Sequence, residues 1–109
     1  MRLPRNQRQQ LVSFYSELSS MTYTGAEHHG LKDISEKIES LGFETMEYSN
    51  MNFDVQNGPV NGSVLVFVNG FLKMDGSDEF RFAQVFNICP NGQGGYYVHN
   101  DIFSVMVWF

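Results

Sequence analysis

The pattern of apolar and polar side chains predicts two different elements in the first 29 residues. Within Arg8–Glu17 and just beyond it, apolar residues recur at the i, i+3, i+4, i+7 spacing of an amphipathic helix, at Leu11, Phe14, Tyr15 and Leu18. The pattern then alternates over Met21 and Tyr23, as in a strand, until Gly25 and the polar residues 27–29 end it. We therefore expect a helix of one or two turns, a short strand and a turn.

A second apolar repeat, over Gly30–Leu41, predicts a longer amphipathic helix. Its apolar positions are Leu31, Ile34, Ile38 and Leu41. The opposite side is charged, and Gly42 follows where a helix commonly ends. Asp33 and Lys37 stand four residues apart in the favourable order, which stabilises a helix by about 0.2–0.5 kcal/mol. We expect this helix to bury one face.

After Gly42 the apolar period falls to two, which predicts four long strands. The segments between them are rich in the Gly, Pro, Asn and Asp residues that turns favour. The second strand is apolar at nearly every position, as in a strand that is buried on both faces. We expect the strands at Met46 to Val55, Val64–Met74, Phe80–Cys89 and Tyr96 to about Val107.

The first of these strands changes its apolar face part-way along. Its apolar residues are Met46 and Tyr48 at one parity and Met51, Phe53 and Val55 at the other. Because side chains alternate along a strand, an extra residue would produce this switch. We therefore expect a β-bulge near Ser49 and Asn50 that bends the sheet.

The last strand is apolar on both faces. Simple alternation places Tyr97, His99, Asp101, Phe103, Val105 and Val107 on one face, and Val98, Ile102, Met106 and Trp108 on the other. A helix layer can cover one face, whereas the other must meet more protein. Since the predicted helices are few, we expect a homodimer formed through the sheet face.

Composition is typical of one folded domain. The chain has 109 residues, 42% of them hydrophobic and 17% charged, which is too apolar for a disordered chain. No linker or repeat divides it, so we expect a single domain over residues 1–109. Cys89 has no partner for a disulfide or a zinc site, and no run of about 18 apolar residues predicts a membrane span. We expect a soluble intracellular protein without a metal or cofactor.

The charge balance argues against nucleic acid as a partner. The net charge is −5, whereas nucleic-acid binding depends on clustered Lys and Arg. Three of the seven cations, Arg2, Arg5 and Arg8, stand in the first eight residues, where a solvated terminus is the simpler interpretation. The remaining chain is therefore even more acidic than the total.

Four strings of residues resemble the nuclear transport factor two family. They are Gly30–Leu41 followed by Phe43, Gly70–Lys73 with Asp75, Arg81–Phe86, and Tyr96–Phe103, which reads YYVHNDIF. Their order and spacing match the family over roughly Leu11 to Val107. The resemblance implies an α+β fold, in which a strongly curved antiparallel sheet packs against helices into a cone with a hydrophobic cavity. It also implies a dimer formed through the outer face of the sheet.

The same resemblance implies a function in nuclear import. Members of the family carry the GDP form of the small GTPase Ran and contact phenylalanine-glycine repeats of nucleoporins, in the cytoplasm, in the nucleus and at the pores. Asp75 and Asp78 match an acidic turn that pairs with basic residues of Ran. Ile102 and Phe103 match apolar residues at the cavity mouth that receive an aromatic side chain of the GTPase switch region.

This chain departs from the family pattern at three places. Thr24 stands where the family usually has an acidic residue, and Ser104 replaces a common basic residue. The family also begins with a long amphipathic helix, one aromatic of which helps to bind phenylalanine-glycine repeats. Only about ten residues precede Leu11 here, so residues 1–10 are interpreted as a non-family or truncated N-terminus.

Two other functions fit the same fold. Cone-fold isomerases and dehydratases move a proton with a cavity carboxylate or histidine, and the candidates here are His99, Asp101, Tyr15 and Tyr23, with the pKa of Asp101 raised by apolar neighbours. Rasputin-type scaffolds and mRNA-export proteins use the domain to bind peptides or to dimerise. Because Asn100-Asp101 belongs to the non-catalytic family's own string, we expect no enzymatic activity.

Overall fold

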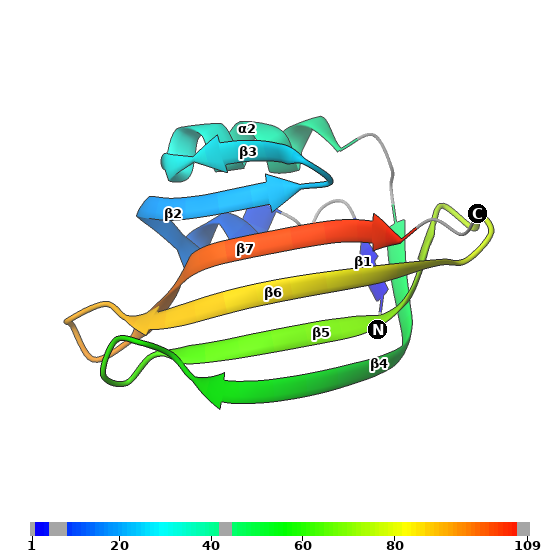
Figure 1. Ribbon diagram of the computed structural model, residues 1–109. Coiled ribbons are helices and arrows are strands. Elements are labelled where there is room, and N and C mark those ends of the chain that lie inside the picture. The colour runs from blue at the N-terminus through cyan, green and yellow to red at the C-terminus, as the bar shows by residue number, and fades with distance from the viewer. Residues whose placement is uncertain (1, 5–8, 42–44, 107–109) are drawn as a thin grey trace.

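The computed structural model describes residues 2–4, 9–41 and 45–106, which form one curved sheet with its helices on one side (Figure 1). Val107 and Trp108, which the sequence places in the last strand, lie outside the described residues. Among those described, no helix is both long and apolar enough to span a membrane. The elements are β1 (Arg2–Pro4), η1 (Gln9–Phe14, a 3-10 helix), β2 (Tyr15–Tyr23), β3 (Ala26–His29), α2 (Gly30–Ser40), β4 (Thr45–Asn57), β5 (Val64–Met74), β6 (Phe80–Pro90) and β7 (Tyr96–Met106).

Within the described residues, seven strands follow the order β1-β4-β5-β6-β7-β2-β3. Strands β4 to β7 form an antiparallel meander, which confirms the four predicted strands. The expectation of an antiparallel sheet is wrong at one pair, since β2 and β7 run parallel. A parallel pair needs a long connection, and here β3, α2 and the whole meander supply it.

The chain before α2 differs from the prediction. The expected helix over Arg8–Glu17 is a shorter 3-10 helix that ends at Phe14, and Tyr15 already begins β2. Ser19 explains this, because its hydroxyl accepts from the Ser16 amide and donates to the Val98 carbonyl of β7, which holds the segment extended. Residues 27–29, expected in a turn, pair with β2 as β3.

Helix α2 confirms the prediction over Gly30–Leu41 to within one residue. Its apolar side faces the sheet, where Ile34 and Ile38 are buried against Met21 of β2. The helix begins directly after β3, and Gly30 makes the junction possible because its φ of +80° lies in the left-handed region that favours glycine. The helix therefore covers the edge of the sheet formed by β2 and β3.

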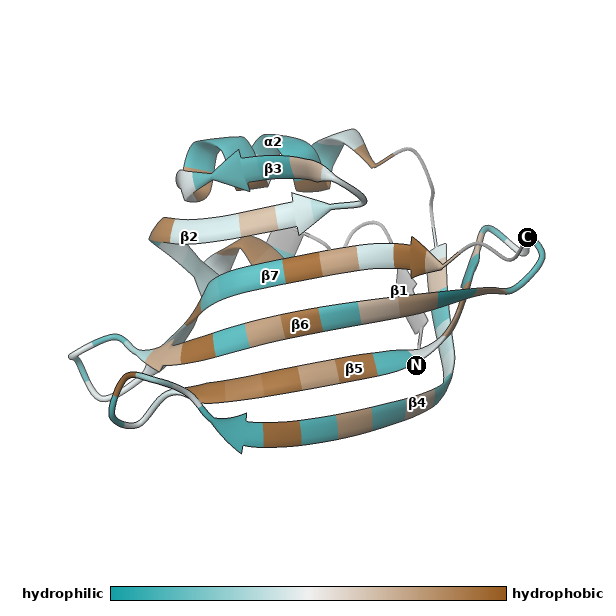
Figure 2. Ribbon diagram, in the orientation of Figure 1, coloured by the Kyte–Doolittle hydropathy of each residue, from teal (hydrophilic) through white to brown (hydrophobic). Residues whose placement is uncertain are grey.

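The main core lies on the inner face of the meander, defined as the face that carries Leu72, Phe82 and Phe103. These side chains are at most 5% exposed, and they cluster with Met46 and Val68. Figure 2 shows β5 as an almost continuous apolar strand, as predicted, but only one of its faces is buried in the single chain. Phe67 on the outer face is 39% exposed.

The predicted bulge in β4 is confirmed. Register with β5 shifts between Ser49 and Asn52, and Asn50 adopts a φ of +50°. Gly70 of β5 lies opposite, where a Cβ atom would come within 3.0–3.1 Å of the bulge backbone. A glycine is required at this close approach, and the bulge bends the sheet around its inner face.

Candidate functional site

A cavity of about 90 Å³ lies between α2, η1 and the inner face of the sheet. Its walls are largely aromatic and aliphatic, with Gln84, Asp101 and Lys37 as the polar exceptions. An apolar groove of about 510 Å³ continues from it across β4 to β7. The cavity residues are Leu11, Tyr15, Met21, Tyr23, Lys37, Ile38, Leu41, Met46, Tyr48, Gln84, Asp101 and Phe103.

Phe103 lines the cavity. It is 5% exposed and stacks on Tyr23 of β2, with ring centroids 5.0 Å apart. On its other side it stacks on Phe82 at 5.8 Å. The Lys37 ammonium of α2 lies 4.6 Å from the centroid of the Tyr23 ring, so a cation–π contact closes that side of the cavity.

Ile102 lies on the opposite face of β7 and is 50% exposed. It pairs with Val85 of β6, which pairs with Phe67 of β5, so the three form a row across the outer face. The two apolar residues predicted together at the cavity mouth are therefore not brought together, because neighbours in a strand point to opposite sides.

Asp101 is the buried polar centre of the cavity. Its side chain is 3% exposed, and it accepts hydrogen bonds from the Tyr15 hydroxyl at 2.6 Å and the Gln84 amide at 2.7 Å. Burial raises the pKa of Asp101, while the bonds from Gln84 and Tyr15 partly offset the rise. Burial likewise raises the pKa of Tyr15, and the neighbouring Asp101 adds to it. The side chains of Tyr15, Gln84 and Asp101 thus form a hydrogen-bonded network that joins β2, β6 and β7.

Sequence reasoning named Tyr15 and Asp101 but missed Gln84. The available signal was its parity, since Gln84 occupies an inward position of β6 between Phe82 and Phe86. A polar side chain at a core position of a strand needs a buried partner. That partner is Asp101.

Asp101→Asn is expected to remove a pH dependence of stability. Because the folded-state pKa of Asp101 is raised above its ordinary value of 3.8, its stabilising contribution is complete below pH 3.8 and is lost as pH rises through the raised pKa. The free energy of unfolding of the unsubstituted chain should therefore fall, relative to that of Asp101→Asn, over this range. Urea unfolding of both proteins at matched pH values measures the difference, and a difference independent of pH would contradict the assignment.

Simple alternation along β7 gives the wrong face for Tyr97 and His99. Asn100 of β7 pairs with Asn87 of β6, and Val98 pairs with Ile88. The step from Asn100 to Val98 is two residues in β7 but only one in β6, so His99 is an extra residue in β7. Val98 consequently lines the inner groove. His99 does not share a face with Asp101; its Nδ1 lies 2.9 Å from the Tyr97 hydroxyl. The sequence-based pairing of His99 with Asp101 is therefore corrected.

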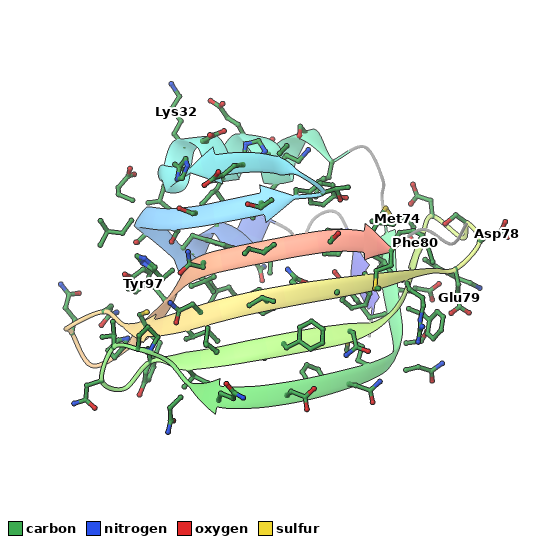
Figure 3. All side chains as sticks on the ribbon, in the orientation of Figure 1. Lys32, Met74, Asp78, Glu79, Phe80 and Tyr97 are labelled. Atoms are coloured by element: carbon green, nitrogen blue, oxygen red, sulfur yellow. The ribbon has the colours of Figure 1, made fainter. Side chains whose placement is uncertain are left out.

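The acidic turn between β5 and β6 holds Asp75 and Asp78 in different roles. Asp75 has a φ of +52°, and it accepts a hydrogen bond from the Thr45 amide at 2.9 Å through Oδ1 while its own amide donates to the Thr45 carbonyl. Asp75 thus fixes the start of β4. Asp78 is exposed and projects from the tip of the turn beside Glu79 (Figure 3). Of the two, Asp78 is the better placed to meet another molecule.

The histidines at the end of β3 bond to different neighbours. His28 Nδ1 lies 2.9 Å from Asp33, whereas His29 contacts Ser20 and Glu27. In the part of the chain that the structure describes, no group of three or more His, Cys, Asp or Glu side chains is arranged to hold a metal ion.

Comparison with known proteins gives one consistent result. Residues 1–105 match the model of the nuclear transport factor 2 (NTF2) domain. The chain is 40% identical over 99 residues to nuclear transport factor 2 of Debaryomyces hansenii, which covers 90% of this chain and 79% of that protein. It is 38% identical over 97 residues to nuclear transport factor 2B of Arabidopsis thaliana, covering 87% and 76% of the two chains.

A solved structure agrees with the sequence matches. The nuclear transport factor 2 structure from Cryptosporidium parvum superposes with a TM-score of 0.85 at 33% identity, over 91% of this chain and 79% of that one. The resemblance of the cavity-bearing sheet therefore extends through most of the fold.

Proposed function

The chain belongs to the nuclear transport factor 2 family, and from this premise we propose that it is a nucleocytoplasmic transport factor that carries the GDP form of the GTPase Ran. Nuclear transport is the function that the relatives' names support. The observation that carries the proposal is the aromatic-walled cavity, which is lined by Phe103 and Tyr23.

The cavity suits an aromatic side chain presented by a partner. Its walls are apolar apart from Lys37, Gln84, Asp101 and the tyrosine hydroxyls, and Asp101 already accepts hydrogen bonds from Gln84 and Tyr15. An aromatic ring in such a desolvated pocket supplies a large share of binding energy. We assign this role to an aromatic side chain of the Ran switch region, with Phe103 as its main contact.

Asp78 supplies the charge that would steer the same partner. It stands at the tip of the turn, clear of the sheet (Figure 3), and the chain as a whole carries a net charge of −5. Carboxylates at the rim of an interface raise association rates with a basic partner. Asp75 supports the turn through its bond to Thr45.

We also assign the outer face of the sheet to a homodimer. The row of Phe67, Val85 and Ile102 crosses β5, β6 and β7, and Phe67 and Ile102 are 39% and 50% exposed, so apolar side chains face solvent in the single chain. A contiguous apolar patch of this kind marks a protein interface. A two-fold dimer would bury the row against its own copy.

Phe67→Asp is expected to convert the dimer into a monomer, because it places a charge within the apolar row. Sedimentation velocity at a fixed protein concentration measures the change. Phe53→Asp, on the inner side of β4 where Phe53 is 58% exposed, is the matched control and should leave the dimer intact. A dimer that survives Phe67→Asp would contradict the assignment.

Further partners and the site of action follow from the same proposal. We assign phenylalanine-glycine repeats of nucleoporins as contacts during passage, and the cytoplasm, nucleus and nuclear pores as the compartments. We propose no catalytic activity for the chain. In support, each oxygen of Asp101 already accepts a hydrogen bond, and His99 lies away from it.

Titration calorimetry with purified Ran tests the proposal. The unsubstituted chain is expected to bind Ran loaded with GDP and not Ran loaded with a non-hydrolysable GTP analogue, since only a state-dependent carrier can load and unload cargo. Equal affinity for both forms, or binding to neither, would overturn the proposed function.

A further inference from the structure

The free edge of β4 is the least protected part of the sheet. In the described residues, β1 pairs with β4 at Thr45, Met46 and Glu47, and β5 is the only strand that pairs with Asn52–Asn57. Alternate residues of a strand direct their N–H and C=O groups to one side. Every second residue of Asn52–Asn57 therefore presents unpaired backbone groups, along roughly 20 Å of edge.

The side chains of this edge do not protect it. Natural edge strands are usually blocked by Lys, Pro or a bulge within the exposed part. Asn52–Asn57 contains neither Lys nor Pro, and the bulge lies before it, between Ser49 and Asn52. Phe53 and Val55 share the inner face and are 58% and 63% exposed. Figure 1 shows this part of β4 at the margin of the molecule, away from α2.

An apolar surface continues inward from the edge. Phe53 pairs with Val68 and Val55 with Val66 on β5. Met51, Phe53 and Val68 also line the apolar groove of about 510 Å³ on the inner face. A strand added to β4 would therefore place every second side chain beside Phe53 and Val55 and extend the floor of the groove.

The charges on β4 indicate which kind of residue an added strand should carry opposite Asp54. Glu47 and Asp54 are the charged residues of Thr45–Asn57, which contains no Lys or Arg. Asp54 points to the outer side, since it pairs with Phe67. A basic residue opposite Asp54 in an added strand would strengthen binding, because oppositely charged cross-strand neighbours attract each other.

We propose that the Asn52–Asn57 edge of β4 binds an extended peptide of a partner protein as an additional antiparallel strand. The peptide has apolar residues opposite Phe53 and Val55 and a Lys or Arg opposite Asp54. Its antiparallel direction continues the pairing that β1 already makes with the beginning of the same strand. The added strand lies outside the cavity, and its basic residue would continue the outer row beyond Asp54, which pairs with Phe67.

The test uses a fluorescently labelled eight-residue peptide of alternating valine and lysine. One version is N-methylated at every valine amide, and a second at every lysine amide. Amides of one parity point to one side of a strand, so only one version should lose binding. Loss of several backbone hydrogen bonds should weaken binding of that version by more than about tenfold, whereas the other version should bind within about threefold of the parent.

Two further comparisons test where the peptide binds and whether its positive charge contributes to binding. A peptide with glutamate in place of lysine should bind at least about fivefold more weakly, and so should Asp54→Lys with the parent peptide. Glu36→Lys on the exposed side of α2 is the matched control and should bind like the unsubstituted chain. Hydrogen exchange with bound peptide should slow at residues 52–57 and stay unchanged at the other sheet edge, Ala26–His29.

Several results would overturn the proposal. One is that the parent peptide shows no detectable binding, and another is that the two methylated peptides bind equally well or lose binding equally. The others are that the glutamate peptide binds as well as the parent, or that hydrogen exchange slows at Ala26–His29 in place of residues 52–57. Because the methylated and glutamate peptides are tested on the unsubstituted chain, a defect in the folding of a variant cannot imitate the expected result.

Discussion

Replacing Phe82 with alanine is expected to lower the free energy of unfolding by about 3–5 kcal/mol, since this is the usual cost of removing a buried phenylalanine ring. Phe82 is 1% exposed and lies between two other rings of the inner face. Its ring centroid is 5.5 Å from that of Tyr48 and 5.8 Å from that of Phe103. The substitution therefore leaves a void where the cavity wall is supported. Urea unfolding at one fixed protein concentration measures the loss.

Phe53→Ala is the matched control for this prediction. Phe53 is also a phenylalanine on the inner side of the sheet, but it is 58% exposed. Its removal should cost less than about 1 kcal/mol, because little buried surface is lost. Equal losses for the two substitutions would contradict the position of the core at Phe82.

The second large effect is expected in Ran binding. Asp78→Lys should weaken the affinity for Ran in its GDP form at least tenfold, which is about 1.4 kcal/mol, because it removes an attraction and adds a repulsion at the rim. The loss should shrink at high salt, since exposed charges are screened. Titration calorimetry at two salt concentrations measures both effects.

Glu36→Lys changes the net charge of the chain by the same amount at an exposed position of α2. It should retain nearly the full affinity, because it lies outside the proposed interface. Asp75→Lys is a poorer probe, since the Asp75 carboxylate holds the Thr45 amide and its loss would disturb the start of β4. The role of the turn is refuted if Asp78→Lys and Glu36→Lys bind Ran equally well.

The difference between the two bulges shows where sequence patterns are informative. In β4 the apolar residues change parity near Ser49 and Asn50, so the extra residue was predictable. In β7 both parities of the strand are apolar, and an extra residue at His99 leaves no trace in the pattern. A one-residue slip exchanges the faces of all residues on one side of it. The positions of Tyr97 and Val98 therefore required the structure.

Tertiary contacts determine the conformation of the segment before α2. The spacing of Leu11, Phe14 and Tyr15 fits a helix, but the buried Ser19 and the Tyr15 hydroxyl bond to β7, which is 79 or more residues away in sequence. Local periodicity cannot report such contacts. Helix α2 was predictable because its apolar stripe and its charged side are both local features.

The candidate site was predictable only in part for the same reason. The motif around Asp101 and Phe103 pointed to a strand that lines the cavity. That Ile102 lies on the outer face followed from alternation alone, whereas the bond between Gln84 and Asp101 joins residues of two different strands. Asp75 was expected at an interface, and its bond to Thr45 became visible only when β4 and β5 were placed side by side.

The proposed function requires the cavity to receive a side chain of Ran, and methionine methyl NMR tests this most directly. Met21 and Met46 line the cavity and are 7% and 6% exposed, whereas Met106 lies on the outer face and is 50% exposed. When Ran loaded with GDP is added to chain labelled at its methionine methyl groups, the Met21 and Met46 signals are expected to shift, because an aromatic ring then lies beside them. The Met106 signal should stay in place. Formation of the complex with shifts at Met106 and none at Met21 or Met46 would contradict the account.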